Sequence, residues 1–485
     1  MLRQESEEYR TVWSDASDLF LNSAPGCELL RCAAGGRPLN VTGAADPAKS
    51  FIVASLAEKT RRKVCVLVPD EARGRALHEE LSAFIPEEAI LTFHSRELSL
   101  IDVRAISRDQ ELMRSAVLTR LLCDDFRVLI LPADATLQRV RPPDIFRRFV
   151  LTVELGQRID PDTLERQLAA AGYERIPQVE NPGQYARRGD IIDVWPPDTR
   201  RGGNSAIRVS FFDIEIDELK ELDPDSQRSV RVIRRAVIPP AREVILTQEE
   251  RLTVAGRLEQ AVTDEVWRSR REGSGRDIAE KLQAAGFREL ERLKEYAFFP
   301  SIDRLLPLID VEICTVMDYA RLAEPLCFID EPLTFSRRLD AAHAGFAQRL
   351  ANYMAKGSSF SFSEDCQITP ADVLSAIDRE RSFIALIDMP VSGNGLPGAA
   401  QLPLRARTSD RYRGRPEKVA EDAARVLGEH GAALLYAGSD ERAEQLSLFL
   451  AERGIDTAAV LPALFPRGFA IDALPLLVIG TEDLY

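Results

Sequence analysis

VTGAADPAKS, residues 41–50, joins a run predicted to be a strand at 39–41 to an apolar run predicted to be a helix at 51–56. Gly43, Lys49 and Ser50 stand at the spacing of a phosphate-binding loop. In such a loop backbone N–H groups surround the phosphates, the lysine reaches the outer phosphates, and the serine binds magnesium. The stretch therefore predicts an α/β domain built around a nucleotide-binding loop.

Three residues of this loop disagree with nucleotide binding. Ala48 replaces the second glycine, and its Cβ crowds the backbone where a phosphate must approach. Pro47 lacks a backbone donor, and Asp46 adds negative charge beside the position of a triphosphate. An active nucleotide site remains one interpretation, but the three defects together favour a structural remnant.

LCFIDE, residues 326–331, is an apolar run that ends in Asp330 and Glu331, the form of a segment that holds magnesium beside a nucleotide. Taken alone, it can equally be a strand followed by an acidic helix start. Together with the loop at 41–50, it suggests that the domain descends from a helicase-type nucleotide-binding fold. We find no arginine motif of a second motor domain in the last 130 residues.

Working outward, the pattern predicts four units. Short apolar runs alternate with helical periodicity in the first unit, which indicates a parallel sheet. An α+β insert follows, with one continuous strand expected at 230–237. A mostly helical unit then ends in a long helix at 333–354 and a Ser-rich linker at 357–365. A second α/β pattern starts at 367 and includes a strand at 383–386. The expected domains are 1–145, 146–240, 241–357 and 358–485.

The composition of the chain argues against several classes of protein. The 485 residues carry a net charge of −14, which argues against a dedicated non-specific DNA binder, because phosphate contacts need clustered cations. The seven cysteines show no CxxC spacing and the four histidines are far apart, so we expect neither a metal site nor a disulfide framework. The absence of a long apolar run or a signal segment predicts a cytoplasmic protein without membrane contact.

GQYARRGDIIDVWPP, residues 183–197, is the most specific recognition candidate. Arg187 and Arg188 precede a turn at Gly189, and arginine suits bidentate pairing with carboxylates. Further arginines of the insert could converge on the same face, namely Arg158, Arg166, Arg175, Arg200, Arg201 and Arg208. A solvated charged face is the alternative interpretation of these residues.

The same stretch resembles a signature shared by UvrB and bacterial transcription-repair coupling factors. Neighbouring segments resemble the coupling factors in the same order, among them ELGQRID (154–160), LERQLAAAGYER (164–175) and FFDIEIDELKELDPDSQRS (211–229). The resemblance implies a degenerate helicase-like fold with UvrB-like domains 1A (1–145) and 1B (241–357). The inserted domain 2 (146–240) and a small α/β domain 3 (358–485) complete it.

The resemblance also implies a partner, because domain 2 of that family binds UvrA through arginines around the turn. The candidate contact residues are Arg175, Tyr185, Arg187, Arg188 and Trp195. Ala186 departs from UvrB, where an arginine contributes. Trp195 stands where the family usually has phenylalanine, and a core position is the alternative interpretation for it. The degenerate nucleotide site would comprise Gly43, Ala48, Lys49, Ser50, Asp330 and Glu331.

The resulting hypothesis is a non-catalytic module that recruits UvrA to stalled RNA polymerase, with no cofactor and no metal in this stretch. ATP and magnesium are expected only at motor domains beyond residue 485, which would also supply the contacts with RNA polymerase and DNA. The alternative is a UvrB-like, ATP-dependent protein that binds damaged DNA. That alternative requires a working loop at 41–50.

Overall fold

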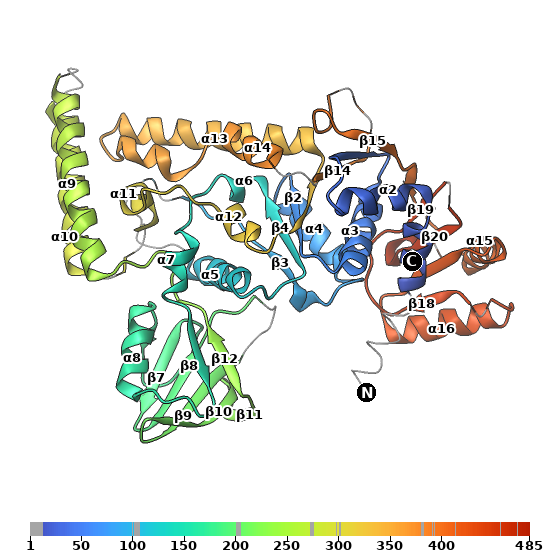
Figure 1. Ribbon diagram of the computed structural model, residues 1–485, viewed down its shortest axis with the longest axis horizontal. Helices are drawn as coiled ribbons and strands as arrows, with labels where there is room; N and C mark the ends of the chain where they lie inside the picture. Colours follow the sequence, from blue (N-terminus) through green and yellow to red (C-terminus); the bar gives the residue numbers. More distant parts are fainter. Residues whose placement is uncertain are drawn as a thin grey trace.

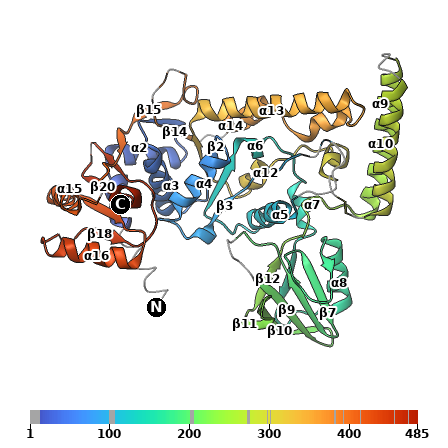
Figure 2. The same cartoon turned by 180° about the vertical axis from the view of Figure 1, so that it is seen from behind.

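The computed structural model describes residues 13–98, 100, 107–199, 205–271, 276–296, 298–299, 302–379, 383–389, 391, 393–412, 414–455, 457–472 and 474–485. Two α/β units lie beside each other at one end of an elongated molecule (Figure 1). An α+β insert and a long helical hairpin extend from the other end, as the view from behind also shows (Figure 2). Within the described residues no helix is both long and apolar enough to cross a membrane.

The larger unit is built on a seven-stranded sheet whose strand pairings are all parallel. Its strands in spatial order are β15 (Ala400–Pro403), β1 (Leu39–Thr42), β14 (Phe383–Ile387), β13 (Leu326–Asp330), β2 (Val64–Val68), β4 (Val128–Pro132) and β3 (Ile90–Thr92). The predicted α/β class is confirmed. Because carboxyl ends of parallel strands meet at one edge, the loop after β1 and the end of β13 come together there.

Helices cover both faces of this sheet. One face packs against α2 (Ala24–Ala33), α3 (Asp46–Thr60) and α4 (Glu71–Leu81). The other packs against α5 (Arg108–Leu122), α12 (Val316–Arg321), α13 (Pro332–Met354) and α14 (Pro370–Asp378). Helix α3 is buried continuously from Pro47 to Ala57. A helix that is buried on every side must be enclosed by other parts of the chain. The second α/β unit covers the side of α3 that faces away from the large sheet.

The second unit contains a five-stranded sheet in the order β16-β19-β20-β17-β18. The strands are β16 (Ala406–Thr408), β17 (Ala432–Tyr436), β18 (Ala459–Leu461), β19 (Phe469–Ile471) and β20 (Leu476–Ile479), with helices α15 (Pro416–Gly428) and α16 (Asp440–Ala451). Its aromatic side chains pack on the larger unit: the ring centroids of Phe51 and Phe469 lie 5.3 Å apart, and those of Phe84 and Tyr436 lie 6.0 Å apart.

The strand predicted at 383–386 belongs to the first sheet, not to the second α/β pattern. β14 lies between β1 and β13, and β15 pairs with β1. The chain crosses to the second sheet only between Pro403 and Ala406. Every β14 residue is buried, and a strand buried on both faces carries the same apolar pattern in either sheet. Sequence order alone therefore gave the wrong assignment.

The insert has a six-stranded sheet, mostly antiparallel, with α8 (Pro161–Ala170) on one face. Its strands are β6 (Glu174–Arg175), β7 (Gln184–Arg188), β8 (Ile191–Trp195), β9 (Ala206–Phe212), β10 (Glu215–Asp223) and β11 (Arg228–Val232). The single strand predicted at 230–237 is wrong. β11 ends at Val232, and a separate strand β12 (Arg235–Ile238) pairs with β5 (Leu151–Glu154), where the insert joins the body.

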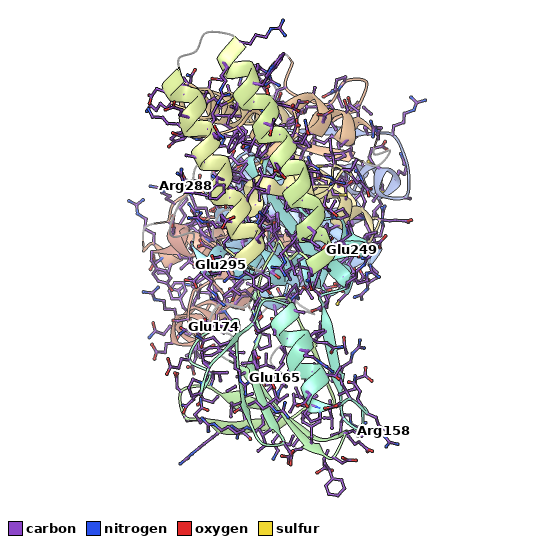
Figure 3. The ribbon with its side chains drawn as sticks, turned by 90° about the vertical axis from the view of Figure 1, so that its left-hand side faces the viewer. Arg158, Glu165, Glu174, Glu249, Arg288 and Glu295 are labelled. Carbon is purple, nitrogen blue, oxygen red and sulfur yellow. The ribbon has the colours of Figure 1, made fainter. Side chains whose placement is uncertain are left out.

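The helical hairpin consists of α9 (Gln248–Arg271) and α10 (Arg276–Glu295). It extends away from the insert (Figure 3). The long helix predicted at 333–354 is confirmed as α13. The Ser-rich segment after it is not a linker, however. Phe360 is buried and stacks on Phe362 with centroids 5.3 Å apart, and Ser361–Cys366 forms a 3₁₀ helix against the core.

Candidate functional site

Backbone groups of neighbouring strands fill the mouth of the loop at 41–50. Gly43 has φ +70°, and a Cβ there would lie 3.2 Å from the backbone nitrogen of Arg405. The Ala44 N–H donates to the Ile387 carbonyl at 3.0 Å, and the Ala406 N–H donates to the Gly43 carbonyl at 2.7 Å. Helix α3 then starts at Asp46, with Pro47 in its first turn. Neighbouring strands thus occupy hydrogen-bonding groups at the mouth of the loop.

Lys49 is held by three carboxylates. Its Nζ lies 2.6 Å from Asp330 Oδ1, 2.8 Å from Glu331 Oε1 and 2.9 Å from Asp46 Oδ1, and its side chain is 1% exposed. Burial alone would lower the pKa of Lys49, but Asp330, Asp46 and Glu331 raise it above its ordinary value. The ammonium has three donors, and the carboxylates offer an acceptor to each. The lysine that would reach phosphates in a working loop is thus fully engaged.

Asp330 has a second cationic partner that sequence reasoning missed. Its Oδ2 accepts from Arg73 Nε at 2.6 Å, and Arg73 also pairs with Glu80 at 2.9 Å. Both residues lie on the buried side of α4 with Gly74 and Leu77. Charged residues on the apolar stripe of a helix are a signal that could have revealed this cluster. Burial raises the pKa of Glu80 to about 7, although Arg73 opposes the shift.

Glu331 and Ser50 are also satisfied internally. Glu331 adopts φ +50°, and its Oε1 accepts from the Asp388 N–H at 2.7 Å. Ser50 is fully buried and donates from its Oγ to the Pro47 carbonyl at 2.8 Å. Because this hydroxyl donates a hydrogen bond within its own helix, it does not point to the position of a magnesium ligand. The six predicted residues of the nucleotide site do meet in space, but they bond to one another and to nearby chain.

A cleft of about 670 Å³ opens between this loop and the second α/β unit. It is rich in carboxylates, contributed by Asp46, Glu79, Glu80, Asp388 and Glu482. Two arginines of the second unit face it, but Arg407 pairs with Asp472 at 3.2 Å and Arg467 lies 3.8 Å from Asp483. Asp46 and Glu80 are likewise paired, with Lys49 and Arg73, so Glu79, Asp388 and Glu482 supply the surplus of negative charge that opposes a triphosphate at this position.

Two of the predicted arginines, Arg187 and Arg188, lie on β7 of the β7–β8 hairpin, whose turn includes Gly189 at φ +62°. Arg188 is exposed and donates to the Pro177 carbonyl at 3.1 Å. Across the described residues, no carboxylate lies within 4.0 Å of its guanidinium. Arg188 therefore offers a charge that the insert has not neutralised.

Two other predicted arginines share one carboxylate, Glu165 of α8. Arg175 lies 2.8 Å and Arg187 lies 2.7 Å from its oxygens, and Arg187 contacts Asp162 as well. The Arg187 side chain is 22% exposed, whereas that of Arg175 is 62% exposed. Figure 3 shows Glu165 on α8. Arg175 and Arg187 are thus brought together, but each is already compensated in charge.

The two aromatic candidates are core residues, which corrects the expectation that they face a partner. Tyr185 is 4% exposed, and its hydroxyl donates to Glu165 at 3.4 Å. Trp195 is 5% exposed and packs with Val179, Ala186, Ala206 and Leu222. Trp195 follows the period-two alternation of β8 on the sheet face away from α8, where the segment around Val179 covers it. Sequence alternation could not reveal that cover.

One further ion pair orders this hairpin. Arg208 of β9 lies directly across from Asp193 of β8 and binds both of its oxygens, at 2.7 and 2.8 Å. Asp193 is buried, so the pair positions the strand that carries the signature. Among the other arginines considered, Arg200 and Arg201 lie outside the described residues.

The insert is anchored to the body by a buried ion pair and flanked by a cleft. Arg114 of α5 binds both carboxylate oxygens of Glu243, at 2.7 and 2.9 Å, where the chain leaves the insert.

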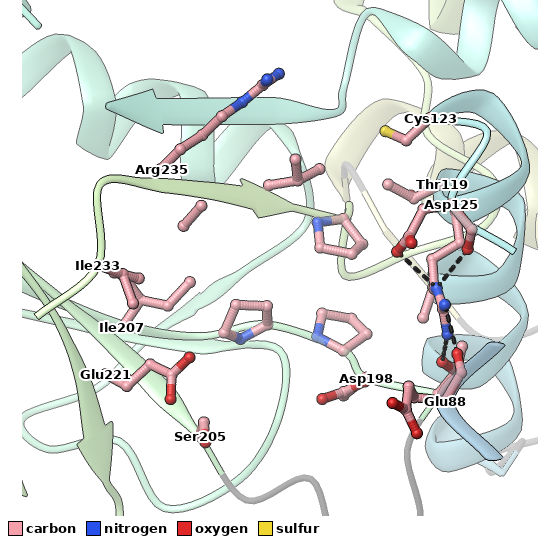
Figure 4. A pocket seen from close by; sticks show the side chains of 18 of the residues that line it. Glu88, Thr119, Cys123, Asp125, Asp198, Ser205, Ile207, Glu221, Ile233 and Arg235 are labelled. Carbon is pink, nitrogen blue, oxygen red and sulfur yellow. Dashed lines mark hydrogen bonds and ion pairs between the residues drawn. The ribbon is translucent and has the colours of Figure 1, made fainter. Parts of the chain in front are cut away.

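A cleft of about 660 Å³ lies between α5 and the insert sheet (Figure 4). On its α5 side, Arg120 donates to Thr199 Oγ1 at 2.7 Å and pairs with Asp125 at 3.0 Å. The β7–β8 hairpin that carries Arg188 lies in a different part of the insert, outside the lining of this cleft.

The fold and the site together define a helicase-type nucleotide-binding fold with an inserted α+β domain. Carboxylates and backbone groups of the chain itself occupy its phosphate-binding loop. A match to the family described as the UvrB interaction domain covers residues 151–244, which are the insert. The chain is also 25% identical over 342 residues to the UvrABC system protein B of Kosmotoga olearia, covering 67% of this chain and 50% of that protein.

Most of the chain is homologous to transcription-repair coupling factors. It is 21% identical over 465 residues to that of Bacillus subtilis, which covers 92% of this chain and 38% of that protein. It is 33% identical over 203 residues to that of Escherichia coli, covering 42% of this chain and 17% of that protein. The chain thus spans well under half the length of these coupling factors.

Proposed function

We propose that this chain is a non-catalytic docking module that recruits the nucleotide-excision-repair protein UvrA to sites of stalled RNA polymerase. The insert carries the proposal, because residues 151–244 match the UvrB interaction domain and present Arg188 exposed at the tip of a hairpin. Contacts with RNA polymerase and DNA would come from other parts of a coupling factor. The docking itself would be electrostatic, and it should weaken as salt screens the arginine.

Arg188→Glu tests the docking surface directly. We expect its affinity for purified UvrA to fall at least about tenfold, since arginines at the centre of an interface often dominate binding. The matched control is Arg228→Glu, an exposed arginine on β11 at the opposite edge of the same sheet. Circular dichroism and thermal unfolding would establish that both variants fold. Unchanged binding of a folded Arg188→Glu protein would exclude the proposed surface.

We also propose that the chain does not bind or hydrolyse ATP. The contacts of Lys49 with Asp330, Glu331 and Asp46 support this, because a nucleotide would have to displace carboxylates from a buried lysine. Titration calorimetry with magnesium-ATP should give no heat of specific binding. A tight, magnesium-dependent signal that is lost in Lys49→Ala would instead favour the alternative, a UvrB-like ATP-dependent protein.

A further inference from the structure

A second charged cleft lies far from the insert hairpin, between α10 and the turn that follows α13. Its volume is about 430 Å³. Its lining includes Lys281, Arg288, Glu289, Arg304, Tyr353 and Lys356. Four of these side chains are cationic and one is a carboxylate. Figure 3 shows Arg288 on the outer part of the hairpin, on the side of α10 away from α9.

The single carboxylate does not neutralise the cleft. Glu289 is 1% exposed and forms a close ion pair with the buried Arg304, and it also lies 3.6 Å from Arg292. Its charge is therefore already matched. Across the described residues, neither Arg288 nor Lys356 has a carboxylate within 4.0 Å. In a chain with a net charge of −14, two uncompensated cations facing one cleft stand out.

Lys281 adds a third available charge. Its Nζ pairs with Asp277 at 2.6 Å, but the two side chains are 55% and 77% exposed. An ion pair one helical turn apart and this exposed is weak. The lysine can leave Asp277 at little cost. The cleft can thus direct Lys281, Arg288 and Lys356 toward one ligand.

The walls of the cleft are held in place by close packing. Gly357 is buried at φ +67°, and a Cβ there would lie 3.0 Å from the Ile278 carbonyl and 3.1 Å from Lys281 Cβ. The turn therefore lies directly on α10, which fixes Lys281 and Lys356 on opposing sides. Phe360 is buried beneath them, and Tyr353 and Ser358 contribute hydroxyl groups that can donate hydrogen bonds.

We propose that this cleft binds a phosphate-bearing anion. Three cations that are weakly paired or uncompensated favour a multiply charged ligand, and a phosphate monoester carries about −1.5 to −2 whereas a carboxylate carries a single charge. The volume lies within the usual range for small-molecule sites, about 300–1,000 Å³. The phosphate could belong to a free polyphosphate or to the backbone of single-stranded nucleic acid, and the two sources share this chemistry.

The test uses the 485-residue chain and two probes, inorganic pyrophosphate and a short single-stranded oligothymidylate. Binding would be measured by titration calorimetry in a phosphate-free buffer at low salt. We expect at least one probe to bind, and the double variant Arg288→Ala, Lys356→Ala to lose about tenfold or more in affinity for it. Tighter pyrophosphate binding assigns a free polyphosphate, and tighter oligonucleotide binding assigns nucleic acid.

Lys294→Ala on α10 and Arg349→Ala on α13 are the matched controls, because they remove exposed cations from the same helices outside the cleft. They should bind within about twofold of the unmodified chain. Failure of both probes at about millimolar concentration, or equal binding by the double variant, would overturn the site. Citrate binding as tight as pyrophosphate would overturn its phosphate chemistry. Binding of UvrA should not change in the double variant, which keeps this result separate from the docking proposal.

Discussion

Lys49 Nζ and Asp330 Oδ1 lie 2.6 Å apart between side chains that are 1% and 2% exposed, although 281 positions separate them in the chain. The pair joins the loop after β1 to the end of β13 across the carboxyl edge of the parallel sheet. It places a protein carboxylate where a nucleotide-binding lysine would meet phosphate. Four predictions follow from this and from the packing of the insert.

Breaking the buried pair should destabilise the larger α/β unit. Lys49→Met leaves Asp330 with Arg73 alone, and Asp330→Ala leaves Lys49 and Arg73 without their shared partner. Removing one member of a buried pair typically costs about 3–5 kcal/mol, because the remaining charge stays buried. Lys59→Met is the control on the same helix: its ion pair with Asp18 is about half exposed, and its loss should cost well under about 1 kcal/mol. Urea unfolding would measure all three.

Glu80 should make stability depend on pH. Its pKa is raised from 4.5 to about 7 by burial. The folded chain therefore holds this proton more tightly than the unfolded chain, and stability falls as pH rises between those two values. Glu80→Gln, which resembles the protonated acid, should lose little stability at about pH 5 and should show a smaller decline toward about pH 8. Thermal unfolding of both proteins at several pH values measures this. If the stability of Glu80→Gln falls with pH as steeply as that of the unmodified chain, other groups cause the pH dependence.

The arginines of the insert should contribute unequally to UvrA binding. Arg187 is mostly buried and already paired with Asp162 and Glu165, whereas Arg188 is exposed without such a partner. Arg188→Ala should therefore weaken binding more than Arg187→Ala, and its effect should shrink as salt is raised. Binding titrations at two ionic strengths would measure the difference. Equal losses in the two variants would indicate that UvrA displaces the carboxylates of α8.

Trp195 should matter for folding and not for direct contact. Its side chain is buried, and its indole nitrogen has no hydrogen-bond partner among the described residues. Trp195→Ala should destabilise the insert by about 3–5 kcal/mol, while Trp195→Phe should cost much less, because it keeps most of the apolar volume. Trp267, which is 61% exposed on α9, provides the control: Trp267→Ala should leave unfolding nearly unchanged. A destabilised Trp195→Phe would mean that the indole ring itself is required.

Several features of this protein could be predicted from sequence because their causes are local. Ala48, Pro47 and Asp46 disagree with phosphate binding through sterics, a missing donor and charge within one short loop. The strand predicted at 39–41 is β1 and the helix predicted at 333–354 is α13, since short apolar runs and helical periodicity between turn residues identify such elements. The fold class was therefore accessible without coordinates.

Other features were decided only by tertiary structure. The sheet to which Phe383–Ile387 belongs, the burial of Tyr185 and Trp195, and the pairing of Arg73 with Asp330 all depend on which distant segments pack together. Sequence identified Lys49, Asp330 and Glu331 as parts of a degenerate site, yet not that they fill it themselves. Local chemistry fixes turns and strand patterns, whereas burial and charge pairing arise from contacts between different elements, some of them hundreds of positions apart.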